Sequence, residues 1–383
     1  MRIFIEPTEP LLFRTGRSFN AGESNFAETI FPPTPETMQG AIRAMIAAHT
    51  SLVDSTMSIA TRFGTATLTN LIGDRSHYGR FRITGLALGK YTKEDGLVRL
   101  FPAPAPLIKV RFRGDKDPTI VQLKPQELPG IINDRLDTMQ YLTPPDFDKR
   151  GEVEGKPKAA GWLTEQSLRV ALDTHLGFPS IKSEAEFYTL EPRLGIGMQN
   201  ETKTTRTGYL YQVQMIRMHE TYGFVVDIRL SEGNNPGRFT DDSKTQADLG
   251  LPDTGWLTLG GEQRAAHFTV LGVTPQEEIM GAQKPGKRVY LATPVYFSRG
   301  WQPPGEYFTP DHKLIAAAVN KPESIGGWSL NPNNAGGNSK TTRRCVPAGS
   351  VYFFDKPVSV TQPLTEYGWQ IGYGIAYTGD YES

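Results

Sequence analysis

The chain has 383 residues, enough for two domains of ordinary size; 38% of them are apolar, and 39 Gly and 29 Pro exceed average usage. This composition argues against a helical bundle and indicates many turns and irregular strands. The 41 basic and 41 acidic side chains cancel, which excludes an overall field that would bind nucleic acid or membranes indiscriminately. Any contact with RNA or DNA must therefore be local.

The cysteine content and the apolar runs indicate a cellular compartment. A single cysteine, Cys345, excludes an internal disulfide framework and a thiolate metal cluster, and fits a reducing environment. The first residues are too short an apolar run for a signal peptide, and no run approaches the ~18 apolar residues of a membrane span. We expect a cytoplasmic protein.

The N-terminal segment predicts a strand over residues 2–5, followed by a bend at prolines. Residues 14–22 then form a polar loop that contains Arg14, Arg17 and the aromatic Phe19. Two arginines and an aromatic side chain suit contacts with phosphate and base, although a solvated turn with salt-bridged arginines explains the same residues.

A helix is predicted to begin after this loop. Thr34 is a natural N-cap, Pro35 occupies the first helical position, and apolar residues follow at helical spacing. The free N–H groups of such a helix can bind an anion, and Arg43 lies about two turns in. A well-capped core helix is the alternative interpretation.

Residues 78–113 predict several strands and form the most basic segment of the chain. Residues 144–158 alternate between acidic and basic side chains, which predicts an exposed or disordered insertion. A charged stretch of this kind is usually a solvated face.

The central stretch, residues 191–217, predicts a hairpin. Residues 193–198 alternate apolar side chains with glycines, and residues 209–216 continue the alternation of a strand with one buried face, beginning at Tyr209. The polar connection carries Lys203 and Arg206, so its tip is expected to be solvated and locally positive. Glycines along the first strand would let another backbone approach closely, although an ordinary surface hairpin fits the same pattern.

The rest of the chain predicts further strands, over residues 223–230, 256–259, 289–297 and 349–354. A Gly-Gly turn at residues 260–261 presents Arg264, but it matches neither a phosphate-binding loop nor a dinucleotide fingerprint. A loop rich in Asn and Gly, residues 331–339, precedes Lys340, Arg343 and Arg344, and no acid lies between Asn331 and Cys345.

Catalytic motifs are missing from the sequence. The six histidines are scattered without metal-ligand spacing, and no Gly-x-Ser-x-Gly elbow is present. RNA cleavage without a metal needs only a general acid and base, so it stays open at this point. We expect no cofactor, no metal and no catalytic residue.

Eight short motifs, taken together and in order, resemble the family of the third subunit of the Cmr complex, the type III-B CRISPR effector. They are residues 13–19, 31–43, 191–196 with 208–211, 259–264, 293–297 with 300–303, 326–328, 346–353 and 372–374. The family often has Gly-Arg-Pro-Phe in the first loop, whereas this chain has Gly-Arg-Ser-Phe. The insertion near residues 146–158 matches no family motif.

The resemblance implies an α+β protein with two ferredoxin-like, RRM-like RAMP domains, a β-hairpin thumb and glycine-rich loops, divided here as residues 1–186 and 187–383. It implies a non-catalytic subunit that binds the 5′ tag of the CRISPR RNA and bridges the large polymerase-type subunit to the backbone subunits. It also implies that target RNA is met only indirectly.

The resemblance places RNA contacts on several of the residues above. They are Arg14, Arg17, Phe19, Arg43, Arg193, Lys203, Arg206, Tyr209 and Arg264, with Lys340, Arg343 and Arg344 added from charge alone. Two rivals remain: a RAMP endoribonuclease that processes the CRISPR RNA precursor, for which His49 and His267 are candidates, and a β-rich structural or carbohydrate-binding protein.

Overall fold

The chain forms two compact units in the computed structural model, which describes residues 1–14, 26–27, 29–74, 77–127, 139–144, 152–173, 177–199, 201–232, 239, 244–272, 284–309, 311–331 and 334–380. The first unit comprises residues 1–97, 185–272 and 324–344, and the second comprises residues 98–184, 273–323 and 345–383. Each unit is thus assembled from three separate segments of the chain.

The first unit is built on antiparallel strands in the spatial order β14-β15-β1-β13-β3. Strand β1 (Arg2–Pro7) is central because Ile3, Phe4 and Ile5 are apolar on both faces, and all three are buried. The elements that surround it are α1 (Pro35–His49), α2 (Ile59–Phe63), α3 (Ala66–Ile72), β3 (Phe81–Thr92), β13 (Tyr222–Leu230), α5 (Thr245–Asp248), β14 (Thr254–Leu259) and β15 (Arg264–Leu271).

Helix α1 begins where the sequence predicted. The Thr34 side chain accepts a hydrogen bond from the Thr37 N–H at 3.4 Å, and Pro35 occupies the first turn. The predicted apolar stripe is buried, with Met38 and Ile42 fully so, and the helix packs beside β14. Its N-cap and its apolar stripe therefore place α1 on the sheet.

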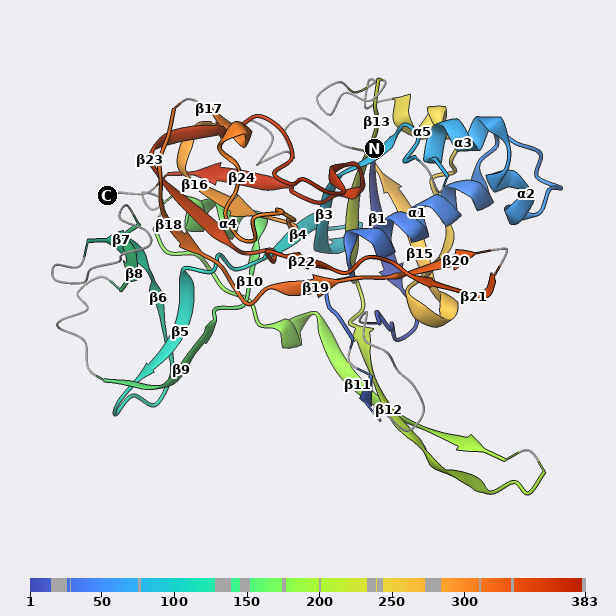
Figure 1. The fold of residues 1–383 in the computed structure, drawn as a ribbon, viewed down its shortest axis with the longest axis horizontal. Helices are drawn as coiled ribbons and strands as arrows, with labels where there is room; N and C mark the ends of the chain where they lie inside the picture. Colours follow the sequence, from blue (N-terminus) through green and yellow to red (C-terminus); the bar gives the residue numbers. More distant parts are fainter. Residues whose placement is uncertain are drawn as a thin grey trace. The chain divides into compact units, whose positions relative to one another are not determined.

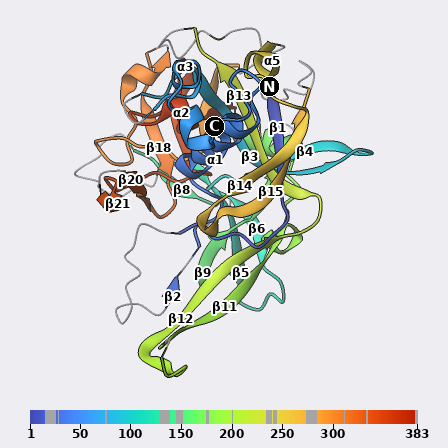
Figure 2. The same cartoon turned by 90° about the vertical axis from the view of Figure 1, so that its right-hand side faces the viewer.

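Two hairpins complete the first unit. The longer one joins β11 (Tyr188–Met198) to β12 (Thr205–Met218), and the short strand β2 (Phe26–Ala27) runs parallel to β12. The other joins β20 (Trp328–Asn331) to β21 (Asn334–Ser339). Figures 1 and 2 show β11 and β12 running out from the sheet of this unit, with their distal half away from its other strands.

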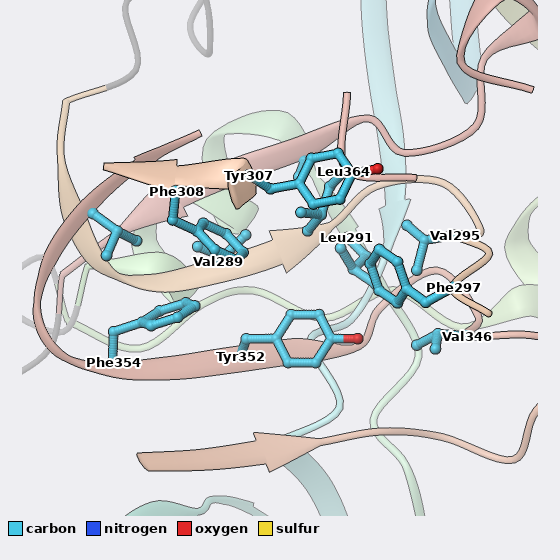
Figure 3. Close-up of a cluster of buried hydrophobic side chains, with 12 residues drawn as sticks. Val289, Leu291, Val295, Phe297, Tyr307, Phe308, Val346, Tyr352, Phe354 and Leu364 are labelled. Atoms are coloured by element: carbon cyan, nitrogen blue, oxygen red, sulfur yellow. The ribbon is translucent and has the colours of Figure 1, made fainter. Parts of the chain in front are cut away.

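The second unit has its own sheet and its own core. Strands β17 (Phe308–Thr309), β23 (Val351–Val360), β16 (Gly286–Leu291) and β24 (Ala376–Gly379) lie in that order, and β18 (Leu314–Ala318) also pairs with β23. Their apolar side chains meet in one cluster, in which Leu291, Tyr352 and Phe354 are among the buried members (Figure 3). The Tyr352 hydroxyl donates to the Trp301 carbonyl at 2.6 Å, and burial raises its pKa.

The remaining elements of the second unit are short. They are β5 (Leu107–Phe112), β6 (Thr119–Gln122), β7 (Lys124–Gln126), β8 (Tyr141–Thr143), β9 (Val153–Ala159), β10 (Trp162–Thr164) and α4 (Glu165–Leu172). Three further strands lie where the chain passes from one unit to the other: β4 (Gly96–Pro102), β19 (Glu323–Ile325) and β22 (Arg343–Cys345). Residues 145–151 of the predicted insertion lie outside the described residues. Residues 152–158 are exposed, as expected, but residues 153–159 form a strand because they pair with β5.

The sequence predicted a mixed α and β protein dominated by strands, and the structure confirms it. Within the described ranges, no helix is long and apolar enough to cross a membrane.

Candidate nucleic-acid interface

The β11–β12 hairpin is anchored at its base and exposed beyond it. Its strands pair in register from Tyr188 opposite Met218 out to Met198 opposite Thr205, with an irregularity near the tip. Ile216 exchanges two main-chain hydrogen bonds with Leu11, and the Phe31 ring lies 4.5 Å from that of Tyr188. These contacts fix the base to the first unit. Farther out, β2 is the one described strand that pairs with the hairpin, at Gln212 and Val213.

The predicted single buried face of β12 is therefore only partly correct. Met215 is 2% exposed, whereas Tyr211, four residues farther from the base on the same face, is 39% exposed. Alternation predicts which side chains share a face, but burial depends on whether another element covers that face. Here the cover ends near the base.

An exposed apolar row lies on the opposite face of the hairpin, and the sequence analysis did not single it out. Leu190, Leu194, Ile196 and Met198 alternate along β11, and Leu210 lies across from Ile196. Leu194 is 74% exposed. Their alternation with Gly195 is visible in the sequence, but alternation indicates a strand and does not show which face is exposed.

Gly195 does not lie on an open glycine face. It pairs with Tyr211, and a Cβ added at Gly195 would come within 2.2 Å of the Tyr211 ring. The ring therefore occupies the space above the glycine. The expectation that this face admits another backbone was wrong at Gly195, because the ring of its cross-strand partner Tyr211 fills the space that the glycine leaves.

Glu191 joins two arginines near the base of the hairpin. Arg193 donates to one carboxylate oxygen at 2.6 and 2.8 Å, and Arg217 donates to the other at 2.7 Å. The hydrogen bond from Arg217, followed by that from Arg193, lowers the pKa of Glu191. Arg193 thus has a carboxylate partner that the sequence analysis did not assign to it, and three charged groups leave one net positive charge.

The tip of the hairpin is a compact turn. The Gln199 N–H donates to the Thr204 carbonyl at 2.8 Å, and the Lys203 N–H donates to the Gln199 carbonyl at 2.9 Å. Lys203 has a φ of 54° and an exposed side chain. Strand β12 carries Arg206 and Tyr209, whose side chains lie outside the described part of the structure. Lys203 is presented to solvent as predicted.

The N-terminal candidates divide into two groups. Arg14 forms an isolated bridge with Thr29, while Arg17 and Phe19 lie outside the described residues. Arg43 turns toward its own unit: it donates to the Gly73 carbonyl at 2.7 Å, lies 5.8 Å from the Phe63 ring centre, and has its pKa lowered by burial. The contacts of Arg43 fit the alternative interpretation, a core helix, better than an open phosphate site.

The Gly-Gly turn before Arg264 packs against its neighbours. Gly260 has a φ of +74°, and the Gly261 N–H donates to the Leu12 carbonyl at 2.8 Å. Arg264 forms ion pairs with Glu9 and Glu262. Two carboxylates beside one guanidinium make a local balance that does not favour a phosphate.

The second basic group lies after the β20–β21 hairpin. Residues 334–339 form a strand, so the predicted loop of residues 331–339 is partly regular structure. Lys340 and Arg344 are exposed, while Arg343 is half-buried and donates to the Thr341 carbonyl at 3.4 Å. Lys340 and Arg344 remain candidates for contact with an anion.

Two arginines of the most basic segment are structural. Arg82 is buried and donates to the carbonyls of Gly79 and Phe81. Arg99 is buried against the carboxylate of Glu165, with the two shortest contacts at 2.5 and 2.7 Å. Part of the positive charge of this segment is therefore buried in the structure and is not available to a ligand.

The histidines considered for catalysis pack against aromatic rings. His49 Nε2 lies 2.6 Å from the Trp256 carbonyl, and its ring meets that of Phe268. The His267 ring meets that of Trp256. In the described ranges, no group of three His, Cys, Asp or Glu residues could hold a metal ion.

A family model described as CRISPR-associated protein (Cas_Cmr3) matches residues 3–381. No curated protein matches. A chain of the type III-B Cmr-beta complex bound to cognate target RNA and AMPPnP is 16% identical, with a TM-score of 0.49 over 92% of this chain and 86% of that one. A chain of the Csm1–Csm4 cassette with AMPPNP is 13% identical, with a TM-score of 0.31 over 94% and 88%.

Proposed function

Since the chain belongs to the CRISPR-associated Cas_Cmr3 family, as its motifs predicted, we propose that this Cmr3-type subunit of a type III-B effector binds the 5′ tag of the CRISPR RNA without cleaving RNA. It bridges the large polymerase-type subunit to the backbone subunits and meets target RNA indirectly. This role calls for a shaped local site, which agrees with the net charge of zero.

The observation that carries this proposal is the β11–β12 hairpin. Its distal part combines the exposed cation Lys203 with the exposed apolar row of Leu194 and Ile196. Single-stranded RNA is bound by cations that meet phosphates and by apolar or aromatic side chains that meet bases. The hairpin presents both kinds of group on a support that is anchored at its base.

The first unit supports the ferredoxin-like part of the proposal. In chain order, β1, α1, β3, β13, α5 and β15 follow the pattern βαββαβ, and the four strands lie in the order β15-β1-β13-β3 with antiparallel neighbours. This order supports a split βαβ fold, the fold of RRM domains, for the first unit. A second ferredoxin-like domain and a thumb role for the hairpin stay predictions.

The partners and the location follow from the same role. The exposed apolar row suits coverage by a neighbouring subunit or RNA, because apolar side chains gathered on one surface mark interaction sites. The buried Cys345 fits the reducing cytoplasm in which we place the protein.

The geometry favours the non-catalytic role over the endoribonuclease rival. A general base must reach the proton that it abstracts. His49 is engaged with the Trp256 carbonyl, and His267 packs on the Trp256 ring. These contacts support a packing role for both histidines.

The experiment is co-purification of the tagged protein from its host, followed by sequencing of the bound RNA. We expect guide RNAs that share one repeat-derived 5′ tag. A variant with Arg193, Lys203 and Arg206 replaced by alanine should lose most of this RNA and keep its partner subunits, because these cations lie on the hairpin and not in either core.

The matched control replaces Lys93, Lys321 and Lys356, three exposed cations away from the hairpin, by alanine. It removes the same charge and should retain the RNA. Equal retention by both variants would remove the hairpin from the tag site. Bound RNA without a common 5′ sequence, or none at all, would overturn the tag-binding function.

A further inference from the structure

The inserted residues of the second unit form a ribbon with a basic character. Strand β9 pairs with β5, which pairs on its other side with β6 (Figure 1). All seven residues of β9 are exposed. We call the cations on β5 and β9 the basic ribbon; they are Lys109, Arg111, Lys156 and Lys158.

Two lysines of the basic ribbon lie directly opposite each other. Lys109 on β5 is the cross-strand partner of Lys158 on β9. Like charges at directly opposite positions destabilise a pair of strands. Within the described ranges, neither lysine has an ion pair or a side-chain hydrogen bond, so the repulsion is not offset by the protein itself.

The carboxylates of the ribbon are not placed to neutralise this pair. Glu152 forms an exposed ion pair with Arg113, with 2.9 Å between the charged atoms. Glu154 lies across from Arg111. Strands β5 and β9 therefore carry four cations and one carboxylate, that of Glu154.

Strand β9 also forms against its local preference. Gly155 has a φ of +77°, Pro157 cannot donate to a ladder, and the register between β5 and β9 shifts there. Segments that break local rules in a folded protein are most often functional sites. The sequence predicted an exposed or disordered segment here from its alternating acidic and basic side chains.

Protection of a sheet edge is the competing explanation. Lysine and proline on an edge strand prevent pairing with other chains, which accounts for Lys156, Pro157 and Lys158. It does not account for Lys109, because β5 is the central strand of the three. The opposed lysine pair thus needs a different explanation.

We propose that the basic ribbon binds the phosphate backbone of single-stranded RNA at a site separate from the hairpin. Lys109 and Arg111 are two residues apart on one face of β5, which spaces them about 6.8 Å along the strand. A row of cations at regular spacing suits a regular row of phosphates, and a phosphate between Lys109 and Lys158 would relieve their repulsion.

The contact is independent of RNA sequence. Phosphate contacts fix a backbone but read no base, and β9 carries no aromatic side chain for stacking. The inference rests on the proposed function only in that the ligand is RNA; it does not need the 5′ tag.

The test uses the full chain and a labelled oligouridylate, which lacks a repeat-derived tag. Anisotropy gives the affinity between about 50 and 200 mM salt for the wild type and for the Lys109→Ala/Lys158→Ala variant. Loss of two phosphate contacts lowers the salt slope by about 1.4, so the wild-type affinity should fall about sevenfold more over this range than that of the variant.

The control is Lys321→Ala/Lys356→Ala, which removes two exposed lysines of the same unit outside the ribbon. Its salt slope should equal that of the wild type. Thermal melting should show that the ribbon variant folds, since removing opposed like charges does not destabilise the strands.

Two results would overturn the proposal. One is that the wild type does not bind oligouridylate, or that the ribbon variant and its control bind it with equal salt slopes. The other is unchanged RNA binding with weaker assembly of the ribbon variant, which would assign the ribbon to an acidic protein partner. Neither result depends on the tag, so tag binding by the hairpin is tested separately.

Discussion

At the scale of single residues, Glu191 sets the charge of the hairpin base. Its carboxylate forms ion pairs with both Arg193 and Arg217. Its lowered pKa keeps the carboxylate ionised at pH values below the ordinary Glu pKa of about 4.3. The ion pairs are therefore present at neutral pH and are lost only as the pH falls through that lowered pKa. Neutral pH does not release the arginines.

Replacement of Glu191 by Gln should mimic this acid form at neutral pH. Freed of the carboxylate, the arginines can take one more phosphate, so the salt slope for tagged RNA should rise by about 0.7, or two- to threefold in affinity over a fourfold change in salt. Anisotropy with labelled tagged RNA measures it.

The matched control is Glu201→Gln at the hairpin tip. Glu201 is exposed and has no ion pair within the described part of the chain, so this change adds the same charge without releasing an arginine. If both variants shift the slope equally, the effect is long-range charge and the Glu191 ion pairs are irrelevant to binding.

At the scale of elements, Gly195 and Tyr211 act as one cross-strand unit. Replacement of Gly195 by Ala forces the Tyr211 ring aside, since the new Cβ would lie 2.2 Å from it. The ring is partly exposed and can move, so we expect destabilisation at or below the usual overpacking range of about 1–3 kcal/mol. Urea unfolding measures this change.

The same substitution in a Tyr211→Ala background should cost much less, because the ring that it would displace is missing. A double-mutant cycle isolates this coupling. Equal destabilisation in the two backgrounds would show that the ring does not fill the space above Gly195, and the glycine face would again be open to another backbone.

At the scale of the whole molecule, stability resides in the cores of the units and not in the hairpin. Replacement of Leu291, which is fully buried in the second unit, by Ala should destabilise the protein by about 2–5 kcal/mol. The same substitution at the exposed Leu194 should stay within about 0.5 kcal/mol. Urea unfolding of the two variants compares identical chemistry at two burial levels.

A cost at Leu194 as large as that at Leu291 would contradict this distribution and would mean that the apolar row is packed in the free chain. The small expected cost leaves the row available for a partner, which is the premise of its role in binding.

Local patterns in the sequence determined much of the secondary structure. The Thr34 cap and the proline after it located the start of α1, the strand signal of residues 223–230 located β13, and alternation located both strands of the long hairpin. Capping and side-chain period act within a few residues, so the sequence shows them directly. The order of the family motifs identified the family, and the match over residues 3–381 confirmed it.

Tertiary structure alone decided which of these residues are available for binding. Charge counts could not show that Arg43 turns inward, that Glu191 forms an ion pair with Arg193, or that Lys109 lies directly across from Lys158. Those outcomes depend on strand register and on what covers each face, which join residues far apart in the chain. Sequence alone thus located the elements and the family, whereas burial and pairing, which need the whole fold, selected the exposed cations.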